Sequence, residues 1–349
     1  MEQTATSKAA DARKAARRAG LRHVSDDRIA GITRHGKPGR FFYKSPSGAR
    51  IRDARILKRI RALAIPPAWG DVWIAPFDNA HLAATGKDAR GRKQYRYHAG
   101  FAAVRDRDKY LHLVHFAQSL PRLRKQLAAD LRRPGLPREK VIAVVVTLLE
   151  ETLIRIGNED YARDNGSFGL TTLRNRHVKV RGGELRFTFR GKSGKDWALA
   201  IRDRRVAKVV RSCQELPGQH LFEYRDEEGK IQMVTSTDVN AYLHAVCGDD
   251  ISAKDFRTWA GTVEAALAFH ALPDKTPTKS NVRSVIGEVA ERLGNTIAVC
   301  RKCYIHPAIF ERFERGRLQL RGTARARRTG LSAAEKSVLA LLKSKAASA

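Results

Sequence analysis

The sequence has no long hydrophobic run, few cysteines and no obvious metal ligands. No stretch of about 18 apolar residues occurs, so we predict no membrane-spanning helix. The four cysteines are typical of reduced cytoplasmic thiols. Cys300 and Cys303 have the spacing of half a zinc site, but no second close pair exists, so we predict no bound metal. The run 191–193 resembles part of a phosphate-binding loop, but Arg186 stands where Walker A needs glycine, and we predict no nucleotide cofactor.

Acidic residues are few beside basic ones. The 349 residues include 67 Lys and Arg but 36 Asp and Glu, a formal net charge of +31 that is spread along the chain. Each phosphate that a protein neutralises releases counterions, so the sequence predicts strong, salt-dependent binding to nucleic acid. Charge alone does not distinguish DNA from RNA. The content of 42% hydrophobic residues is typical of globular proteins. The length of 349 residues is enough for two domains.

Two patterns of secondary structure follow one another. Residues 24–105 favour strands, and the later chain favours helices around one small antiparallel sheet. The expected early elements are a hairpin at 40–51, a helix at 56–63, strands at 72–74 and 94–97, and a helix at 110–131. The expected later elements are a helix from 141 that ends at Gly157, strands at 178–180 and 185–189 joined by Gly182-Gly183, a turn at 191–195, and helices at 282–293 and 333–342.

One tyrosine near the C-terminal end is a candidate nucleophile. Tyr304 lies in the basic segment Val-Cys-Arg-Lys-Cys-Tyr-Ile-His-Pro, after a helix expected to end at Gly294. A free phenol is mostly protonated at neutral pH, but cationic neighbours favour the phenolate and the charged transition state of attack on a phosphodiester. Tyr304 therefore suggests covalent chemistry on a nucleic-acid backbone.

Four other residues could surround the same phosphate, although each has an ordinary structural explanation. Arg155 lies at the end of a strong helix, where a cation stabilises free carbonyls. Lys192 lies at a hairpin tip, where lysines are usually solvated. Arg257 has bulky apolar neighbours that suggest a partly buried guanidinium. Asn295 follows a glycine that ends a helix, where it could serve only as a cap.

In chain order, these five residues resemble the catalytic residues of type IB DNA topoisomerases, in particular the poxvirus-like enzymes in their bacterial form. The resemblance extends over about residues 25–315. One departure is Asn295, where viral and eukaryotic relatives carry histidine and bacterial-type relatives carry asparagine. An amide still donates a hydrogen bond but cannot transfer a proton. The matching segments are 65–69, 91–97, 155–161, 165–173, 189–192, 255–258 and 294–304.

The resemblance implies a mechanism without ATP or cofactor. Tyr304 would attack a phosphodiester, leaving a 3′-phosphotyrosyl enzyme and a free 5′-hydroxyl. Arg155 and Arg257 would hold the non-bridging oxygens, with Asn295 as a neutral donor, and Lys192 would protonate the departing 5′-oxygen. Rotation of the free end would relax positive and negative supercoils before the strand is resealed.

The resemblance also implies contacts with duplex DNA. Gln94 suits an adenine edge, and Tyr95 and Tyr97 suit base methyls or phosphates, whereas the alternative buries both tyrosines in the core. Tyr161 is expected beside the scissile phosphate. The residues expected at the DNA-contacting strand are Arg92, Lys93, Gln94, Tyr95 and Tyr97.

The implied fold is α+β, with a small mainly β N-terminal domain and a mainly helical catalytic domain that contains a small sheet, as in tyrosine recombinases and type IB topoisomerases. The two would form a bilobed DNA clamp. The expected parts are a flexible basic arm at 1–22, a DNA-binding domain at 23–105, a catalytic domain at 106–316 and a basic extension at 317–349. We expect a monomer in the cytoplasm, acting on the nucleoid without an obligate protein partner.

Two other functions fit part of the sequence. A tyrosine site-specific recombinase shares the active-site plan, but it usually has histidine three residues before the second arginine, where this chain has Lys254. Such enzymes also lack the segments at 65–69 and 91–97. A non-enzymatic nucleoid-associated DNA-binding protein would need the charge but not the five ordered residues.

Overall fold

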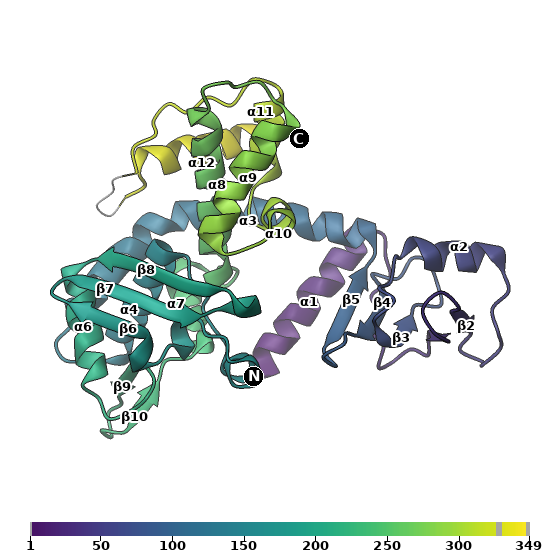
Figure 1. Ribbon diagram of the computed structural model, residues 1–349, viewed down its shortest axis with the longest axis horizontal. Coiled ribbons are helices and arrows are strands. Elements are labelled where there is room, and N and C mark those ends of the chain that lie inside the picture. Colours follow the sequence, from purple (N-terminus) through teal and green to yellow (C-terminus); the bar gives the residue numbers. More distant parts are fainter. Residues whose placement is uncertain (1, 326–329, 347–349) are drawn as a thin grey trace. The chain divides into compact units, whose positions relative to one another are not determined.

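The computed structural model describes residues 2–325 and 330–346 (Figure 1). It divides into two compact units, Met1–Tyr110 and Leu111–Ala349, and the long helix α3 (Ala99–Asp130) crosses the division. Each unit is described by itself below. Among the described residues, no helix combines the length and apolar character that a membrane span requires.

The first unit is built on a five-stranded antiparallel sheet with the order β2-β1-β3-β4-β5. Val72 and Ile74 of β3 pack with Ile60 of helix α2 (Ala54–Ala62), while Trp73 between them packs in a second cluster with Val24. This alternation places apolar clusters on both faces of the sheet. The strands are β1 (Ile32–His35), β2 (Phe42–Lys44), β3 (Gly70–Ile74), β4 (Leu82–Lys87) and β5 (Lys93–Tyr97).

The segment 1–22, predicted as a flexible basic arm, is instead helical over α1 (Glu2–Arg18). Ala15 and Ala16 are buried against Phe101 of α3, and Arg18 forms an ion pair of 2.7 Å with Asp108. The many basic residues of this segment suggested a solvated arm. Its alanines explain the observed packing, because alanine has high helix propensity and its small side chain allows a close approach between helices.

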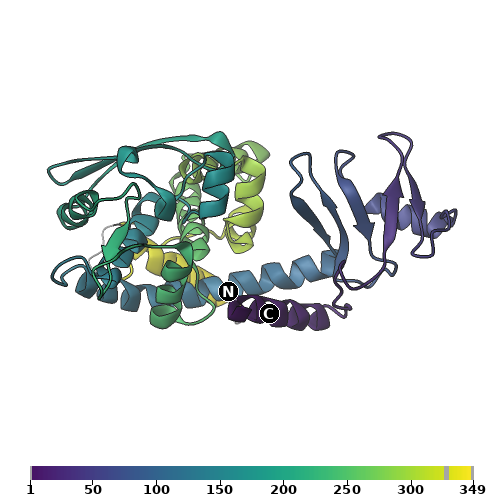
Figure 2. The same ribbon diagram turned by 90° about the horizontal axis from the view of Figure 1, so that it is seen from below.

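The second unit is mainly helical, and its three-stranded sheet has the order β6-β7-β8. The predicted Gly182-Gly183 turn is confirmed, since Arg181 pairs with Glu184 across it. Helices α4 and α6 pack against the sheet (Figures 1 and 2). The strands are β6 (Val178–Arg181), β7 (Glu184–Arg190) and β8 (Asp196–Arg202), with a separate ribbon of β9 (Glu223–Arg225) and β10 (Ile231–Met233). The helices after α3 are α4 (Arg138–Thr152), α5 (Glu159–Asn165), α6 (Arg204–Gln214), α7 (Ser236–Cys247), α8 (Ala253–Ala271), α9 (Lys279–Leu293), α10 (Ile297–Cys303), α11 (Pro307–Glu314) and α12 (Ala333–Ala346).

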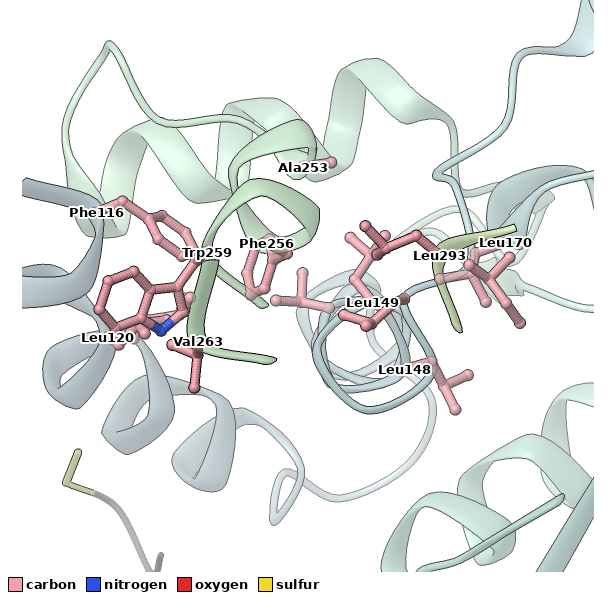
Figure 3. Packing of buried hydrophobic residues seen from close by; sticks show 14 of the residues in the cluster. Phe116, Leu120, Leu148, Leu149, Leu170, Ala253, Phe256, Trp259, Val263 and Leu293 are labelled. Carbon is pink, nitrogen blue, oxygen red and sulfur yellow. The ribbon is translucent and has the colours of Figure 1, made fainter. Parts of the chain in front are cut away.

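Helix α4 lies in the middle of the second unit's core. Figure 3 shows Leu149 of α4 facing Phe256 of α8, with Phe116 of α3 close to Trp259. The rings of Phe116 and Phe256 meet edge to face at 5.0 Å. The predicted end of this helix at Gly157 is wrong, because α4 ends at Thr152 and the next residue, Leu153, is left-handed with φ 57°. The early end exposes backbone carbonyls inside the unit.

The C-terminal helix α12 belongs to the same core. Val338 and Leu342 are buried, and the carboxylate of Glu335 accepts hydrogen bonds from Arg124 of α3 at 2.6 Å and from the Trp259 indole at 3.3 Å. The segment 317–349 was predicted as a basic extension. Its described helix is instead a packed element that joins α3 and α8.

Candidate active site

Arg155 lies in a loop directly after α4, and a second loop supports it from behind. The carbonyl of Arg155 accepts the N–H of Leu170 at 2.9 Å, and a Cβ at Gly169 would lie 2.6 Å from that carbonyl oxygen. Only glycine allows this close approach. The guanidinium of Arg155 donates through Nη2 to Oδ1 of Asn295. Two residues 140 positions apart in the sequence are thereby joined.

Asn295 keeps one hydrogen-bond donor unused. Helix α9 ends at Leu293 and is capped by Gly294, which has φ 61°, and the N–H of Asn295 donates to the Ala290 carbonyl at 2.8 Å. The backbone therefore completes the helix end, and the side chain is not needed as a cap. Its Nδ2 is buried and has no hydrogen-bond partner among the described residues. A buried amide donor without a partner costs stability unless a ligand oxygen accepts from it.

Arg257 is held between the ends of two helices. It is 3% exposed, and its guanidinium donates to the carbonyl of Leu153, after α4, and to that of Leu293, at the end of α9, the latter at 2.6 Å. Burial and the nearby Arg155 lower the pKa of Arg257. Its Nε is also buried without a partner among the described residues. The early end of α4 thus leaves a backbone carbonyl free to accept a hydrogen bond from this arginine.

Tyr304 lies at the end of α10 and packs against the arginine. The Arg257 guanidinium lies 5.0 Å from the centroid of the Tyr304 ring, within the range of a cation–π contact. On α8, a Cβ at Gly261 would lie 2.7 Å from the Tyr304 carbonyl oxygen, and the Thr262 hydroxyl accepts the N–H of His306 at 3.1 Å. The sequence analysis missed Gly261 and Thr262. The available signal was that Gly261 follows Arg257 by four positions, on the same helix face.

Lys192 lies at the turn between β7 and β8, and its ammonium is 5.8 Å from the centroid of the Tyr161 ring. Trp197 of β8, which the sequence analysis did not single out for the site, places this hairpin against α9. A Cβ at Gly294 would lie 2.7 Å from the Trp197 indole, which stacks on Phe189 at 6.1 Å. The hairpin therefore lies beside the residue that precedes Asn295.

The five candidates lie close together in the second unit, since Arg257 is near Arg155 as well as the Tyr304 ring. Arg155 bonds to Asn295, Arg257 contacts the Tyr304 ring, and Arg155 and Lys192 line a cavity of about 320 Å³ together with Tyr161. The cluster presents guanidinium, ammonium and amide donors around a phenol, a combination suited to a phosphate ester. Across residues 2–325 and 330–346, no group of His, Cys, Asp and Glu is arranged to hold a metal ion.

The candidates on β5 occupy both faces of the edge strand. Tyr95 and Tyr97 are 48% and 49% exposed and stack on each other at 6.1 Å, so the alternative that both are core residues is wrong. On the same face, an ion pair with Asp26 raises the pKa of Lys93. Gln94 points the other way and donates to Asp88 at 2.9 Å.

Arg92 comes just before β5 and forms an ion pair of 2.7 Å with Asp88. Asp88 therefore contacts both Arg92 and Gln94. Tyr161 belongs to the other unit, on α5. Of the residues predicted at the DNA-contacting strand, Lys93, Tyr95 and Tyr97 therefore share one face of β5, whereas Gln94 lies on the other face.

Comparisons with known proteins show which family the chain belongs to. Residues 98–327 match the family model of the eukaryotic DNA topoisomerase I catalytic core, and residues 40–88 match that of the bacterial DNA topoisomerase IB N-terminal domain. The chain is 32% identical to DNA topoisomerase 1B of Acanthamoeba polyphaga mimivirus over 287 residues. This matched region covers 79% of this chain and 85% of the viral protein. DNA topoisomerase 1B of vaccinia virus (strain Copenhagen) is 21% identical over 237 residues, 66% of this chain and 72% of the relative. The predicted α+β fold and family are confirmed, and the chain belongs to the type IB DNA topoisomerases, isomerases that act on DNA.

Proposed function

We propose that this enzyme relaxes positive and negative supercoils by cutting one DNA strand through a 3′-phosphotyrosyl intermediate at Tyr304, without ATP or a cofactor. The observation that supports this best is the contact of the buried Arg257 guanidinium with the Tyr304 ring. A fixed cation beside the phenol stabilises the negative charge that develops in the transition state as the phenol oxygen attacks phosphorus.

Each of the other residues has a role that suits its chemistry. The Tyr304 oxygen bonds to phosphorus, and the bond from phosphorus to the 5′-oxygen breaks. Arg155 and Arg257 hold the non-bridging oxygens through planar forks, and the unused Nδ2 of Asn295 donates to one of them. Lys192 gives a proton to the departing 5′-oxygen, while the phenol proton passes to solvent. Resealing reverses these steps, so the linkage to tyrosine conserves the energy of the broken bond.

We further propose that the enzyme acts as a monomer on duplex DNA of the nucleoid. The exposed face of β5 with Lys93, Tyr95 and Tyr97 offers a cation and two aromatic rings to DNA. The proposed parts are a DNA-binding domain at 23–105 and a catalytic domain that begins at 106 and, with the packed helix α12, extends past 316. The paired Gln94 and Arg92 require release from Asp88 before either can read a base.

The variant Tyr304→Phe tests the proposed nucleophile. We expect it to bind duplex DNA as the unchanged enzyme does, because the ring and its contact with Arg257 remain. It should neither relax a supercoiled plasmid nor form a covalent adduct. The matched control is Tyr224→Phe. Tyr224 is a half-buried tyrosine on β9, distant in sequence from Tyr304, and its substitution should leave relaxation unchanged. Relaxation by the Tyr304→Phe variant would rule out the assignment.

A further inference from the structure

Among the residues that the structure describes, the Lys192 ammonium lies over an aromatic ring and not beside an acid. The ammonium makes no hydrogen bond or ion pair among the described residues, and it lies 5.8 Å from the centroid of the Tyr161 ring, over the ring face. The Lys192 side chain is exposed, whereas the Tyr161 ring is half-buried. A flexible lysine of this kind has many rotamers, and a nearby ring face restricts them.

The backbone fixes this ring relative to the turn that carries Lys192. The N–H of Tyr161 donates to the Asn158 side chain at 2.8 Å, and its carbonyl accepts from Asn165 at 3.2 Å. The N–H of Phe168, just beyond α5, donates to the carbonyl of Arg190 at the end of β7, at 2.8 Å. Helix α5 and the hairpin are thereby tied together two residues before Lys192.

The turn itself leaves the lysine backbone little freedom. The N–H of Gly191 donates to the Lys195 carbonyl at 2.8 Å, and Ser193 and Gly194 both have left-handed backbone with φ 64° and 75°. A non-glycine residue in this region marks a constrained turn. The backbone thus sets the origin of the Lys192 side chain, and the Tyr161 ring limits where its ammonium can lie.

We propose that Tyr161 is a positioning residue that holds the Lys192 ammonium at the cavity lined by Arg155, ready to protonate the departing 5′-oxygen. The inference rests on the proposed role of Lys192 as the acid. Arg155 and Lys192 line the same cavity, and the ring lies in its wall. Proton transfer requires the acid to lie within hydrogen-bond reach of the oxygen, so an ammonium already near the cavity needs less ordering when DNA binds. The ring provides this function, and the phenol hydroxyl is not needed.

The test compares Tyr161→Leu with Tyr161→Phe in single-turnover cleavage of a suicide duplex, made with either a 5′-oxygen or a 5′-sulfur leaving group. A thiolate leaves without protonation, so the sulfur substrate does not need the acid. We expect Tyr161→Leu to cleave the oxygen substrate about tenfold more slowly and the sulfur substrate at the rate of the unchanged enzyme. Tyr161→Phe keeps the ring and should recover most of the lost rate.

Two results would overturn the inference. Equal slowing of both substrates by Tyr161→Leu would indicate a general structural fault, and a Phe variant as slow as the Leu variant would assign the role to the hydroxyl. Lys192→Ala on the same substrates separates this inference from the proposed function. If the 5′-sulfur substrate restores the cleavage rate of Lys192→Ala but not that of Tyr161→Leu, the positioning role of Tyr161 is rejected and the acid role of Lys192 stands. Failure of sulfur to rescue Lys192→Ala rejects the acid assignment itself.

Discussion

At the scale of single residues, the proposed mechanism gives Asn295 a part in binding the phosphate and none in proton transfer, because an amide is neither an acid nor a base at neutral pH. Its Oδ1 accepts from Arg155 and its Nδ2 remains available to a ligand. The position therefore needs a donor and not an acid or base. A histidine could meet the same need through a ring N–H.

This argument predicts opposite results for two substitutions of Asn295. Asn295→Asp replaces the donor with a negatively charged oxygen facing the phosphate, and we expect cleavage to slow by about 10²-fold or more. Asn295→His keeps a donor and should cleave within about tenfold of the unchanged enzyme. Single-turnover cleavage of a suicide duplex measures both. Equal loss in the two variants would show that the position does not act by donating a hydrogen bond.

The residue pattern predicted the candidates that bear chemistry but not those that position them. Arg155, Lys192, Arg257, Asn295 and Tyr304 have reactive or charged side chains in a recognisable order. Gly261 and Trp197 act through close packing between segments distant in sequence, at Tyr304 and Gly294 respectively. In a sequence, a glycine required for close approach between segments cannot be distinguished from a glycine in a loose turn, and only the three-dimensional structure separates the two.

At the scale of elements, the predicted helices and the small sheet are largely confirmed because their apolar periodicity is strong. The helix from 141 and that at 282–293 correspond to α4 and α9, and the hairpin around Gly182-Gly183 to β6 and β7. The end of α4 was predicted wrongly. Leu153 adopts a left-handed conformation that its residue type disfavours, while its carbonyl accepts from Arg257. A tertiary contact of this kind has no local signature.

One glycine directly after α9 and one within it test how the helix end supports the site. Gly294 has φ 61°, and a Cβ there would lie 2.7 Å from Trp197. We expect Gly294→Ala to cost about 1–3 kcal/mol in free energy of unfolding and to slow cleavage, because Trp197 and its hairpin must move. The control Gly287→Ala lies within the same helix with no atom within 4 Å and should stabilise by about 0.5–1 kcal/mol. Urea unfolding and cleavage rates check both, and a harmless Gly294→Ala would contradict this role.

The C-terminal helix α12 contributes to stability through a buried carboxylate. Glu335→Ala leaves Arg124, which is 6% exposed, with Glu150 as its remaining ion-pair partner among the residues that the structure describes. We expect a loss of about 3 kcal/mol in free energy of unfolding, since a buried charge loses part of its compensation. The control Glu228→Ala breaks an exposed pair with Lys230 and should change stability by about 0.5 kcal/mol or less. If the two variants unfold at the same urea concentration, α12 is not held in this way.

At the scale of the whole molecule, the excess of positive charge predicts that the affinity for DNA depends steeply on salt concentration. With a net charge of +31, a site that contacts about six to ten phosphates should lose about 10³-fold or more in affinity between about 50 and 200 mM salt. Tyr304→Phe makes the measurement possible by fluorescence anisotropy, because it cannot form the covalent adduct. Affinity that is insensitive to salt would mean that phosphate contacts do not dominate.

The central claim is that Tyr304 forms the covalent link to DNA. The most direct measurement traps the enzyme on a suicide duplex, digests the adduct and sequences the peptide that remains attached to the oligonucleotide. We predict a single peptide containing Tyr304, linked to the 3′-phosphate at the cleavage site, and no adduct with Tyr304→Phe. Attachment through another residue, or to a 5′-phosphate, would contradict the account.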